Sequence, residues 1–310
     1  MLPYIIRRLL WLPVLLSIMV FITFVLGFYG PGGPEVVLLG QRYDPETAAR
    51  IREEWGFNDP LLVQYFRYLY NYANLNFGES LVKYQGQPIS ELVARRLPIT
   101  LQLNLAAFLI GIPAGITLGM VAAFFRGGLV DRGIIVSTLF IGSVPILVLG
   151  PILLFIFARQ LRILPAGGWD GLFSASAILP VALLSLGYFG GYARITRASV
   201  LEVLSADYVR TARAKGLSEK LLMTRHVLRN AFIPLVTFLG FAIGGLVEGT
   251  LMTELIFGIP GMGQFAFEAI SSRDYPIVIA LVVMGALVFA MANLVADLLY
   301  GVVDPRIRHT

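Results

Sequence analysis

The sequence predicts an all-α membrane protein with six transmembrane helices and both termini on the cytoplasmic side. Hydrophobic residues make up 57% of the 310 residues, only 14% are charged, and the mean hydropathy is +0.78. Soluble domains carry roughly 25% charged residues, so this composition is typical of a membrane protein. Six uncharged runs each hold about the 20 residues that a crossing helix needs. The short alternating β segments of a membrane barrel are absent from the sequence.

The six uncharged runs define the spans and the organisation of the chain. In order they are 9–34, 97–125, 133–158, 171–193, 230–247 and 275–296. We therefore expect a first transmembrane helix within 1–34, an extracytoplasmic loop with short surface helices at 35–96, and a core of five transmembrane helices at 97–310. The core includes a long cytoplasmic loop at 194–232.

The orientation follows from the distribution of Lys and Arg. With both termini inside, 14 of the 24 basic residues fall on cytoplasmic segments and seven fall in the long outer loop, where the positive-inside rule is weak. The short outer loops hold only Arg159, Arg162 and Arg273. The first apolar run is longer than that of a signal peptide and lacks a small-x-small cleavage site, which favours a retained helix. This asymmetry accounts for the basic pI of about 9.5, so no nucleic-acid partner is needed.

The long outer loop shows signs of helical order. Two Asp-Pro pairs, at Asp44 and Asp59, have the pattern of an N-cap followed by proline at the first helical position. The second pair predicts a helix over 61–73 that is rich in aromatic residues. Two interpretations stay open for it: a helix at the membrane surface, or a plain connector. A third short helix, 89–96, leads into the second span.

Small residues and prolines mark the spans. Gly111, Gly115 and Gly119 recur every four residues in the second span, a spacing that lets helix backbones approach closely in lipid. The pairs Gly240/Gly244 and Gly245/Gly249 have the same spacing in the fifth. Four prolines are expected to interrupt helices or allow bending: Pro113, Pro145, Pro151 and Pro180.

Residues for catalysis are missing from the sequence. The two histidines lie outside the spans, so no Ser-His pair can form there, and no cluster has the ligand spacing of a zinc site. A phosphate-binding G-x-x-x-x-G-K-[ST] loop is also absent. Two carboxylates are nevertheless expected in membrane spans: Asp297 near the inner end of the sixth span, and Glu248 deeper, in the fifth. For Glu248, a functional and a structural role are both open.

The basic segment 205–234 has the features of a docking surface. The segment contains six Lys and Arg residues and only two acidic residues, so we expect it on the cytoplasmic side. We expect Ser205 to cap a helix running to Lys215, Gly216 to end it, and Ser218 to cap a second helix. Ala212 and Gly216, one helical turn apart, are small enough for a second protein to approach.

At this point the sequence resembles a known family along essentially its whole length. The strongest match is Asp207-Tyr-Val-Arg-Thr-Ala-Arg-Ala-Lys-Gly216, followed by Arg225-His226, Asn230 and Pro234. Further matches are Ile6-Arg-Arg-Leu-Leu10, Gly78-x-Ser80, Arg96-Leu-Pro-x-Thr100, Glu254-x-x-Phe-Gly-x-Pro-Gly-x-Gly263, Arg273-Asp-Tyr-Pro276 and Asp304-Pro-Arg306. The chain is similar to permease subunits of the dipeptide/oligopeptide/nickel group of ATP-binding-cassette (ABC) importers. Departures from the family's pattern fall at Gly33 and Glu248.

The resemblance implies a type I ABC importer permease fold and a set of functional residues. It implies an ATPase-coupling segment at Asp207, Tyr208, Arg210, Ala212, Lys215, Gly216, Leu217, Arg225 and His226. It implies docking of a solute-binding protein at Gly258, Pro260, Gly261, Gly263 and Gln264. Glu248 and Glu254 are the candidate residues of the translocation path. Arg210 stands where the wider superfamily has glutamate, which is usual in this group.

The implied role is half of a pore in a prokaryotic cytoplasmic (inner) membrane. The expected partners are a second, homologous permease as a heterodimer, two ATPase subunits and an extracytoplasmic solute-binding protein. This chain is expected to bind no cofactor, since ATP and Mg²⁺ belong to the ATPase subunits. Peptides lead as substrates; nickel chelates, glutathione and oligosaccharides stay open. The rivals are an intramembrane enzyme and a proton-coupled secondary transporter using Glu248 and Asp297.

Overall fold

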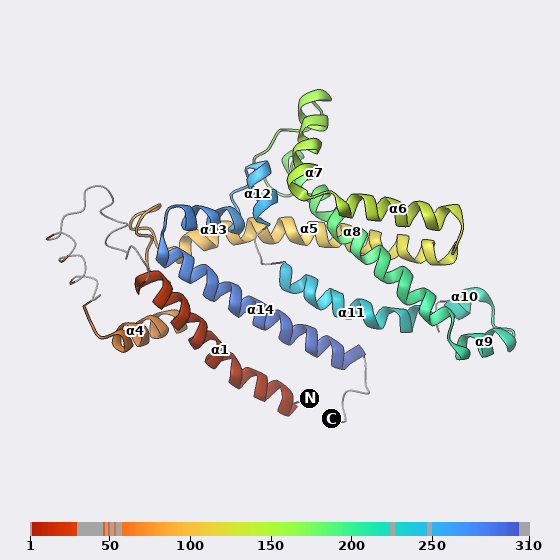
Figure 1. The fold of residues 1–310 in the computed structure, drawn as a ribbon, viewed down its shortest axis with the longest axis horizontal. Coiled ribbons are helices and arrows are strands. Elements are labelled where there is room, and N and C mark those ends of the chain that lie inside the picture. The colour runs from red at the N-terminus through yellow and green to blue at the C-terminus, as the bar shows by residue number, and fades with distance from the viewer. Residues whose placement is uncertain are drawn as a thin grey trace. The chain divides into compact units, whose positions relative to one another are not determined.

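The structure, a computed structural model, describes residues 2–29, 46, 49, 53, 58–223, 227–246 and 250–303. These residues are mostly helical, and one isolated β-bridge pairs Glu79 with Pro88. The helices are α1 (Leu2–Tyr29), α4 (Leu61–Ala73), α5 (Ile89–Phe124), α6 (Leu129–Ser143), α7 (Ile146–Leu153), the π-helix η2 (Leu154–Gln160), α8 (Ala175–Leu204), α9 (Asp207–Ala214), α10 (Glu219–Leu222), α11 (Leu228–Gly245), α12 (Leu251–Phe257), α13 (Met262–Ser271) and α14 (Tyr275–Val303) (Figure 1).

The described helices include several with the length and apolarity of membrane spans. By length and apolarity alone, α5 and α8 could each cross a membrane. The bent pair formed by α6 and α7–η2 would be a third such span if the pair is counted as one. Shorter apolar stretches lie in α1 (Pro13–Val25), α11 (Leu228–Gly240) and α14 (Tyr275–Met291). Each of the six predicted runs therefore overlaps an apolar helix.

The third predicted span is not one straight helix. The axes of Leu129–Ser143 and Ile146–Gln160 differ by 99°. Val144 and Pro145 are extended between them, with ψ of 118° and 144°. The proline ring disfavours a helical conformation for the residue before it and cannot donate a backbone hydrogen bond, so the helix ends there. Of the four prolines expected to interrupt helices, Pro151 and Pro180 lie inside α7 and α8.

Two other predicted boundaries differ. The helix predicted at 89–96 and the second span form one continuous helix, α5. The fourth span continues beyond residue 193 to Leu204, so the first part of the loop predicted at 194–232 is helical. Helix 61–73 is confirmed as α4, although Pro60 is its N-cap and not its first residue.

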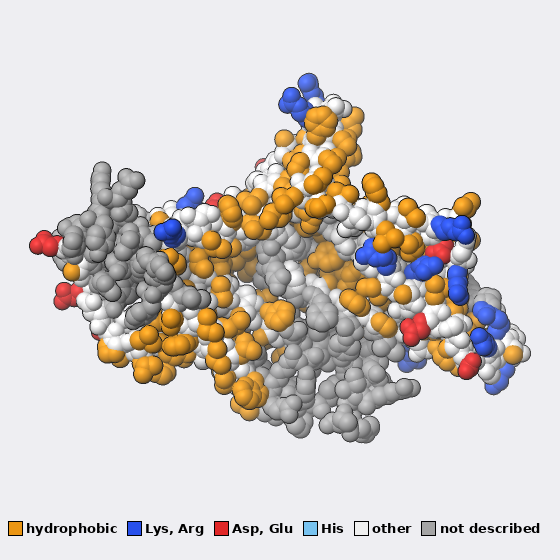
Figure 2. All heavy atoms as spheres, viewed as in Figure 1, with side chains coloured by type: hydrophobic (Ala, Val, Ile, Leu, Met, Phe, Trp, Pro, Cys, Tyr) orange, Lys and Arg blue, Asp and Glu red, His pale blue; other side chains and the backbone are white. Residues whose placement is uncertain are grey.

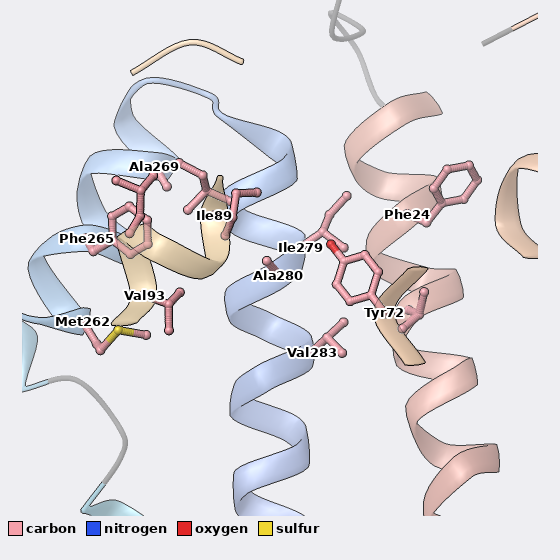
Figure 3. Close-up of a cluster of buried hydrophobic side chains, with 13 residues drawn as sticks. Phe24, Tyr72, Ile89, Val93, Met262, Phe265, Ala269, Ile279, Ala280 and Val283 are labelled. Carbon is pink, nitrogen blue, oxygen red and sulfur yellow. The ribbon is translucent and has the colours of Figure 1, made fainter. Parts of the chain in front are cut away.

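The chain divides into two compact units. Unit 1 comprises Met1–Ile99, Val247–Leu251 and Gly261–Met291; unit 2 comprises Thr100–Leu246, Met252–Pro260 and Ala292–Thr310. Figure 3 shows the core of unit 1, where side chains from α1, α4, the first turns of α5, α13 and α14 meet. Phe24, Phe265, Ile277 and Ile279 are among its fully enclosed side chains.

Helix α4 packs along α1 within unit 1. The Tyr65 hydroxyl donates to the Ser17 carbonyl at 3.0 Å, and the rings of Phe21 and Tyr65 meet edge to face at 5.3 Å between centroids. The Phe24 and Tyr68 rings lie 5.1 Å apart in the next turn. The helix is therefore more than a plain connector, because its aromatic face forms part of a core.

In unit 2, the glycines of α5 pack against the backbone of α8. A Cβ atom at Gly111, Gly115 or Gly119 would lie 2.5–2.7 Å from a carbonyl oxygen of α8. These carbonyls belong to Ser185, Phe189 and Ala193, which repeat with the same four-residue period. The small-residue stripe predicted for this span is confirmed as a close helix contact. In the fifth span, by contrast, a Cβ at Gly245 would meet open space.

Candidate functional site

The α9–α10 hairpin is the predicted coupling segment. Helix α9 ends in a Schellman motif: the Leu217 N–H donates to the Ala212 carbonyl at 3.3 Å, and the Gly216 N–H donates to the Arg213 carbonyl at 3.0 Å. Gly216 has φ +80°, a conformation that disfavours residues with a Cβ. The predicted break at Gly216 is thus confirmed, and α10 begins directly after Ser218.

The predicted cap at Ser205 is wrong. Ser205 ends α8, and its hydroxyl donates to the Glu202 carbonyl at 2.7 Å. Ala206 is the N-cap of α9, and it offers no side-chain oxygen to that helix. A serine beside a helix boundary can serve the helix before it or the helix after it, which the sequence alone does not distinguish.

One face of the hairpin packs against the ends of three longer helices. Val209 of α9 and Leu222 of α10 are fully buried, and they pack with Ala123 of α5, Val200 of α8 and Ala231 of α11. Ala212 is half-buried against the same cluster. A force applied to α9 would therefore reach three long helices of unit 2 through side chains already in contact.

The other face of the hairpin is open and basic. Asp207, Tyr208, Arg210, Lys215 and Gly216 are exposed, and Leu217 is half-buried. Lys and Arg side chains gather at this end of unit 2 (Figure 2). Asp207 and Arg210 form an ion pair at 3.7 Å, but with 98% and 73% of the side chains exposed it leaves the positive charge of the surface largely unneutralised.

Two predicted coupling residues, Arg225 and His226, lie outside the described residues. Nearby, Asn230 of α11 donates from its amide to the Tyr208 hydroxyl at 2.9 Å. This bond joins two residues of the matching motifs across the hairpin. It adds a polar tie between α9 and α11 to the apolar packing beneath.

An ion pair that sequence reasoning missed joins α6 to α8. Arg197 binds Asp131 through two contacts, Nε to Oδ1 at 2.5 Å and Nη2 to Oδ2 at 2.7 Å. The Gly127 N–H also donates to Asp131 Oδ2, at 2.8 Å, so the α5–α6 turn is held as well. Asp131 is 2% exposed, and such a buried carboxylate requires this pairing.

The predicted binding-protein docking residues differ in exposure. Gly258 and Pro260 are exposed, Gly261 and Gly263 are buried, and Gln264 is half-buried. Gly258 has φ +64° and follows α12, whereas Gly261 is the N-cap of α13. The exposed pair is therefore available to a partner, while the buried pair shapes the entry into α13.

A polar cluster in unit 1 supports α13. Arg96 of α5 donates to the Tyr84 hydroxyl at 2.7 Å, and that hydroxyl donates to the Glu268 carboxylate. The Arg96 guanidinium lies 4.4 Å from the centroid of the Phe265 ring. Burial, and then the bond to Glu268, raises the pKa of Tyr84, so this phenol stays protonated as a donor at neutral pH.

Two further matching motifs meet in unit 1. The buried Asp274 carboxylate accepts from the Ser80 hydroxyl and from the N–H groups of Leu81, Val82 and Lys83. The motifs Gly78-x-Ser80, Arg96-Leu-Pro and Arg273-Asp-Tyr-Pro276 thus help hold the segment that precedes α5. The sequence showed each motif separately, without a signal that paired Ser80 with Asp274.

Of the two carboxylates predicted to lie on the translocation path, the structure describes only Glu254. Glu248 lies outside the described residues. Glu254 of α12 is enclosed within unit 2, and the Thr100 hydroxyl donates to its Oε1 at 2.9 Å. Its carboxylate has no surface open to a solute in this chain, and its place on the path stays a prediction. Among the described residues, no group of three His, Cys, Asp or Glu side chains is placed to hold a metal ion.

Comparison with known proteins extends these observations. The oligopeptide transport system permease protein OppB of Haemophilus influenzae is 38% identical over 310 residues, covering 100% of both chains. OppB of Escherichia coli (strain K12) is 37% identical with the same coverage. The probable peptide ABC transporter permease protein y4tP of Sinorhizobium fredii is 37% identical over 312 residues, covering 99% of both chains.

A solved structure and two family models agree with these relatives. An inward-facing structure of the MetNI methionine ABC transporter shares the fold with a TM-score of 0.54 at 17% identity, covering 69% of this chain and 99% of that one. The family model of the N-terminal part of binding-protein-dependent transport system membrane components matches residues 1–104. The model described as binding-protein-dependent transport system inner membrane component matches residues 115–309, and the chain belongs to this family.

Proposed function

We propose that this chain is a permease subunit of an ATP-driven ABC importer and forms half of a translocation pathway for di- and oligopeptides. The observation that carries the proposal is its 37–38% identity, over the full length of both chains, to permeases named for oligopeptide transport. The subunit is a transport component and not a catalytic one. ATP and Mg²⁺ would bind to two partner ATPase subunits.

The α9–α10 hairpin is the proposed contact with an ATPase subunit. Its exposed face is basic and its inner face packs on α5, α8 and α11, so it can receive a movement and pass it on. ATP-driven closure of the ATPases would push on this hairpin and tilt the helices attached to it. Alternating access of the pathway would follow from that tilt.

The proposed topology has six crossings of a prokaryotic cytoplasmic membrane with both termini inside. The overlap of each apolar run with a helix supports it, as does the ratio of 14 basic residues on inner segments to three in short outer loops. Gly258, Pro260 and the segment around Tyr84 then lie outside, where a solute-binding protein would dock. A second, homologous permease would complete the pathway.

Glu248 remains the proposed recognition residue for a positive group of the solute. A carboxylate in a membrane span is costly unless it faces water or a partner. Glu248→Gln should therefore lower the uptake of cationic peptides more than that of neutral ones. Equal uptake of both classes by the variant would leave Glu248 without a role in selection.

The test of the function is uptake by the whole complex. The chain would be co-expressed with its second permease, ATPases and binding protein, reconstituted into liposomes, and supplied with labelled peptides of two to five residues. We expect uptake only when ATP is supplied on the side of the membrane that carries the ATPases. Excess unlabelled peptide should suppress this uptake. Uptake driven by a proton gradient without ATP would contradict the proposal. Competition by nickel chelates, glutathione or oligosaccharides, but not by peptides, would change the substrate class.

A further inference from the structure

Unit 2 contains an apolar groove that the transport proposal does not use. The groove has a volume of about 780 Å³ and lies between α5, the arm formed by α7 and η2, and α8. Ile110, Leu153, Phe157 and Phe173 are among the apolar side chains along it. One hydroxyl, that of Ser185, lines it, and this hydroxyl already donates to the Val181 carbonyl at 2.7 Å. The volume falls in the range of ligand sites, and the lining suits a hydrocarbon chain.

Two arginines lie within two residues of side chains that line this groove: Arg159 follows Phe157, and Arg162 precedes Leu164. A second hollow is lined by Arg159, Gln160 and Arg162 at the free end of the arm. After η2 the chain hooks back, with the Ile163 and Leu164 N–H groups donating to the Phe157 carbonyl at 3.1 and 3.3 Å. Leu164 lines the groove and Ala166 lines the hollow, so this hook borders both. Figure 2 shows Lys and Arg side chains at the free end of the arm.

The charge of these arginines is not neutralised by the part of the chain that the structure describes. Both side chains are exposed, and neither makes an ion pair or side-chain hydrogen bond with a described residue. Arg162 also has φ +54°, an uncommon conformation for a residue with a Cβ. Short outer loops of membrane proteins are depleted in Arg and Lys, so two arginines within four residues require a reason at this position.

We propose that the groove and the arginine hollow together bind an anionic glycerophospholipid. The phosphate lies between Arg159 and Arg162, where charge-assisted hydrogen bonds hold it, and an acyl chain lies in the groove. None of the residues that line the groove or the hollow belongs to the α9–α10 hairpin. Its occupant would be drawn from the bilayer around the protein.

The outward face of the arm favours lipid over a second protein as the neighbour. Exposed residues follow a four-residue period along the arm: Leu147, Val148, Pro151, Ile152, Phe155, Ile156, Arg159 and Gln160. Helix interfaces in membranes are enriched in small residues, because large aliphatic side chains are solvated equally well by lipid tails. This face has large side chains, and the one small residue of α7 besides Pro151, Gly150, points inward against Ile256 and Leu183. Lipid can therefore reach the groove along the arm.

The test counts lipids on the intact complex. The importer would be reconstituted in vesicles of phosphatidylglycerol and phosphatidylethanolamine, extracted in mild detergent, and examined by native mass spectrometry. We expect retained phosphatidylglycerol on the wild type and about tenfold weaker retention on a variant carrying Arg159→Gln and Arg162→Gln, as loss of charge-assisted hydrogen bonds predicts. Arg126→Gln, a change of another exposed arginine, is the matched control and should retain lipid normally.

A second variant tests the groove independently of charge. Ala182 lines the groove and is exposed, so Ala182→Phe should fill it and release the acyl chain, whereas Ala198→Phe on the same helix, outside the groove, should not. Equal phosphatidylglycerol retention by the wild type and the double arginine variant would overturn the proposal. So would a cysteine at position 182 that cross-links efficiently to the second permease. Both results are independent of peptide uptake, which is measured separately.

Discussion

The Ser80 hydroxyl donates a hydrogen bond of 2.6 Å to the carboxylate of Asp274, 194 positions further along the chain. The N–H groups of Leu81, Val82 and Lys83 donate to the same carboxylate at 3.1–3.2 Å. Asp274 directly precedes α14, so this single buried group attaches the segment before α5 to the start of the last helix. An ionised carboxylate is suited to this position because it only accepts hydrogen bonds, and all four partners are donors.

Asp274→Asn should therefore destabilise unit 1. The amide presents an N–H₂ group to N–H donors, and one or more buried donors lose their acceptor, which costs about 2–3 kcal/mol. The measurement is the thermal unfolding midpoint of the purified complex, together with the rate of proteolysis within residues 75–88. Glu79→Gln, an exposed change one residue from Ser80, is the control. Unchanged midpoint and proteolysis in Asp274→Asn would show that the carboxylate does not hold the segment.

Gly119→Ala should weaken the contact between α5 and α8. A Cβ at this position would lie 2.5 Å from the Ala193 carbonyl oxygen and 2.7 Å from the Thr196 Cβ, so the helices must move apart. Overpacking of this kind typically costs about 1–3 kcal/mol. Gly133→Ala in α6 is the opposite case, since its Cβ would meet nothing within 4 Å. That change should raise the unfolding midpoint slightly, because alanine lowers the entropy of the unfolded chain.

The comparison of these two alanine variants is the measurement, made by thermal unfolding in the same detergent. A midpoint for Gly119→Ala at or above that of Gly133→Ala would contradict the assigned helix contact. The pair shares its chemistry and differs only in the space around the new methyl group.

The sequence predicted the elements whose signals are local. Uncharged runs of about 20 residues located the apolar helices, and the glycine period located the packing face of α5. The break at Gly216 was also predictable, because a helix end needs a residue that tolerates positive φ. In each case the physical cause lies within one turn or one span of the residues that show it.

The features that the sequence did not predict depend on distant residues or on competing local choices. Pro145 ends a helix whereas Pro180 lies within one, and only the surrounding packing separates the two outcomes. Arg197 and Asp131 are 66 positions apart, and each has several possible partners of opposite charge in the sequence. The predicted N-cap at Ser205 was wrong for a local reason: its hydroxyl donates to a carbonyl of α8 and not to the first turn of α9.

Breaking the pair between Arg197 and Asp131 should destabilise unit 2. Arg197→Gln leaves a buried carboxylate with one fewer charged partner, and we expect a loss of about 2–3 kcal/mol, below the usual 3–5 for a fully buried pair because the Arg197 side chain is 28% exposed. Asp131→Asn alone should also destabilise, since the Gly127 N–H and the guanidinium lose a charged acceptor.

The double variant provides the decisive measurement for this pair. Asp131→Asn with Arg197→Gln should be destabilised by clearly less than the sum of the single changes, because neither charge is left unpaired. Additive losses in a double-mutant cycle would mean that the two residues act independently. Arg95→Gln, which removes an exposed i,i+4 pair with Glu91, should change the midpoint little.

Gly216→Trp should abolish binding of an ATPase subunit while leaving the permease folded in the membrane. A Cβ at Gly216 would meet nothing of this chain within 4 Å, so the indole fits the isolated subunit and obstructs only a partner on the exposed face. The positive φ adds a strain of about 1–2 kcal/mol for any residue with a Cβ.

Gly216→Asn separates the strain from the obstruction of a partner, because asparagine tolerates this conformation better and is small. Co-purification of the ATPases and ATP-dependent peptide uptake are the readouts. Gly78→Trp, with φ +76° and equally open space, is the matched control for co-purification. Normal co-purification and uptake by Gly216→Trp would remove the α9–α10 hairpin from the ATPase interface.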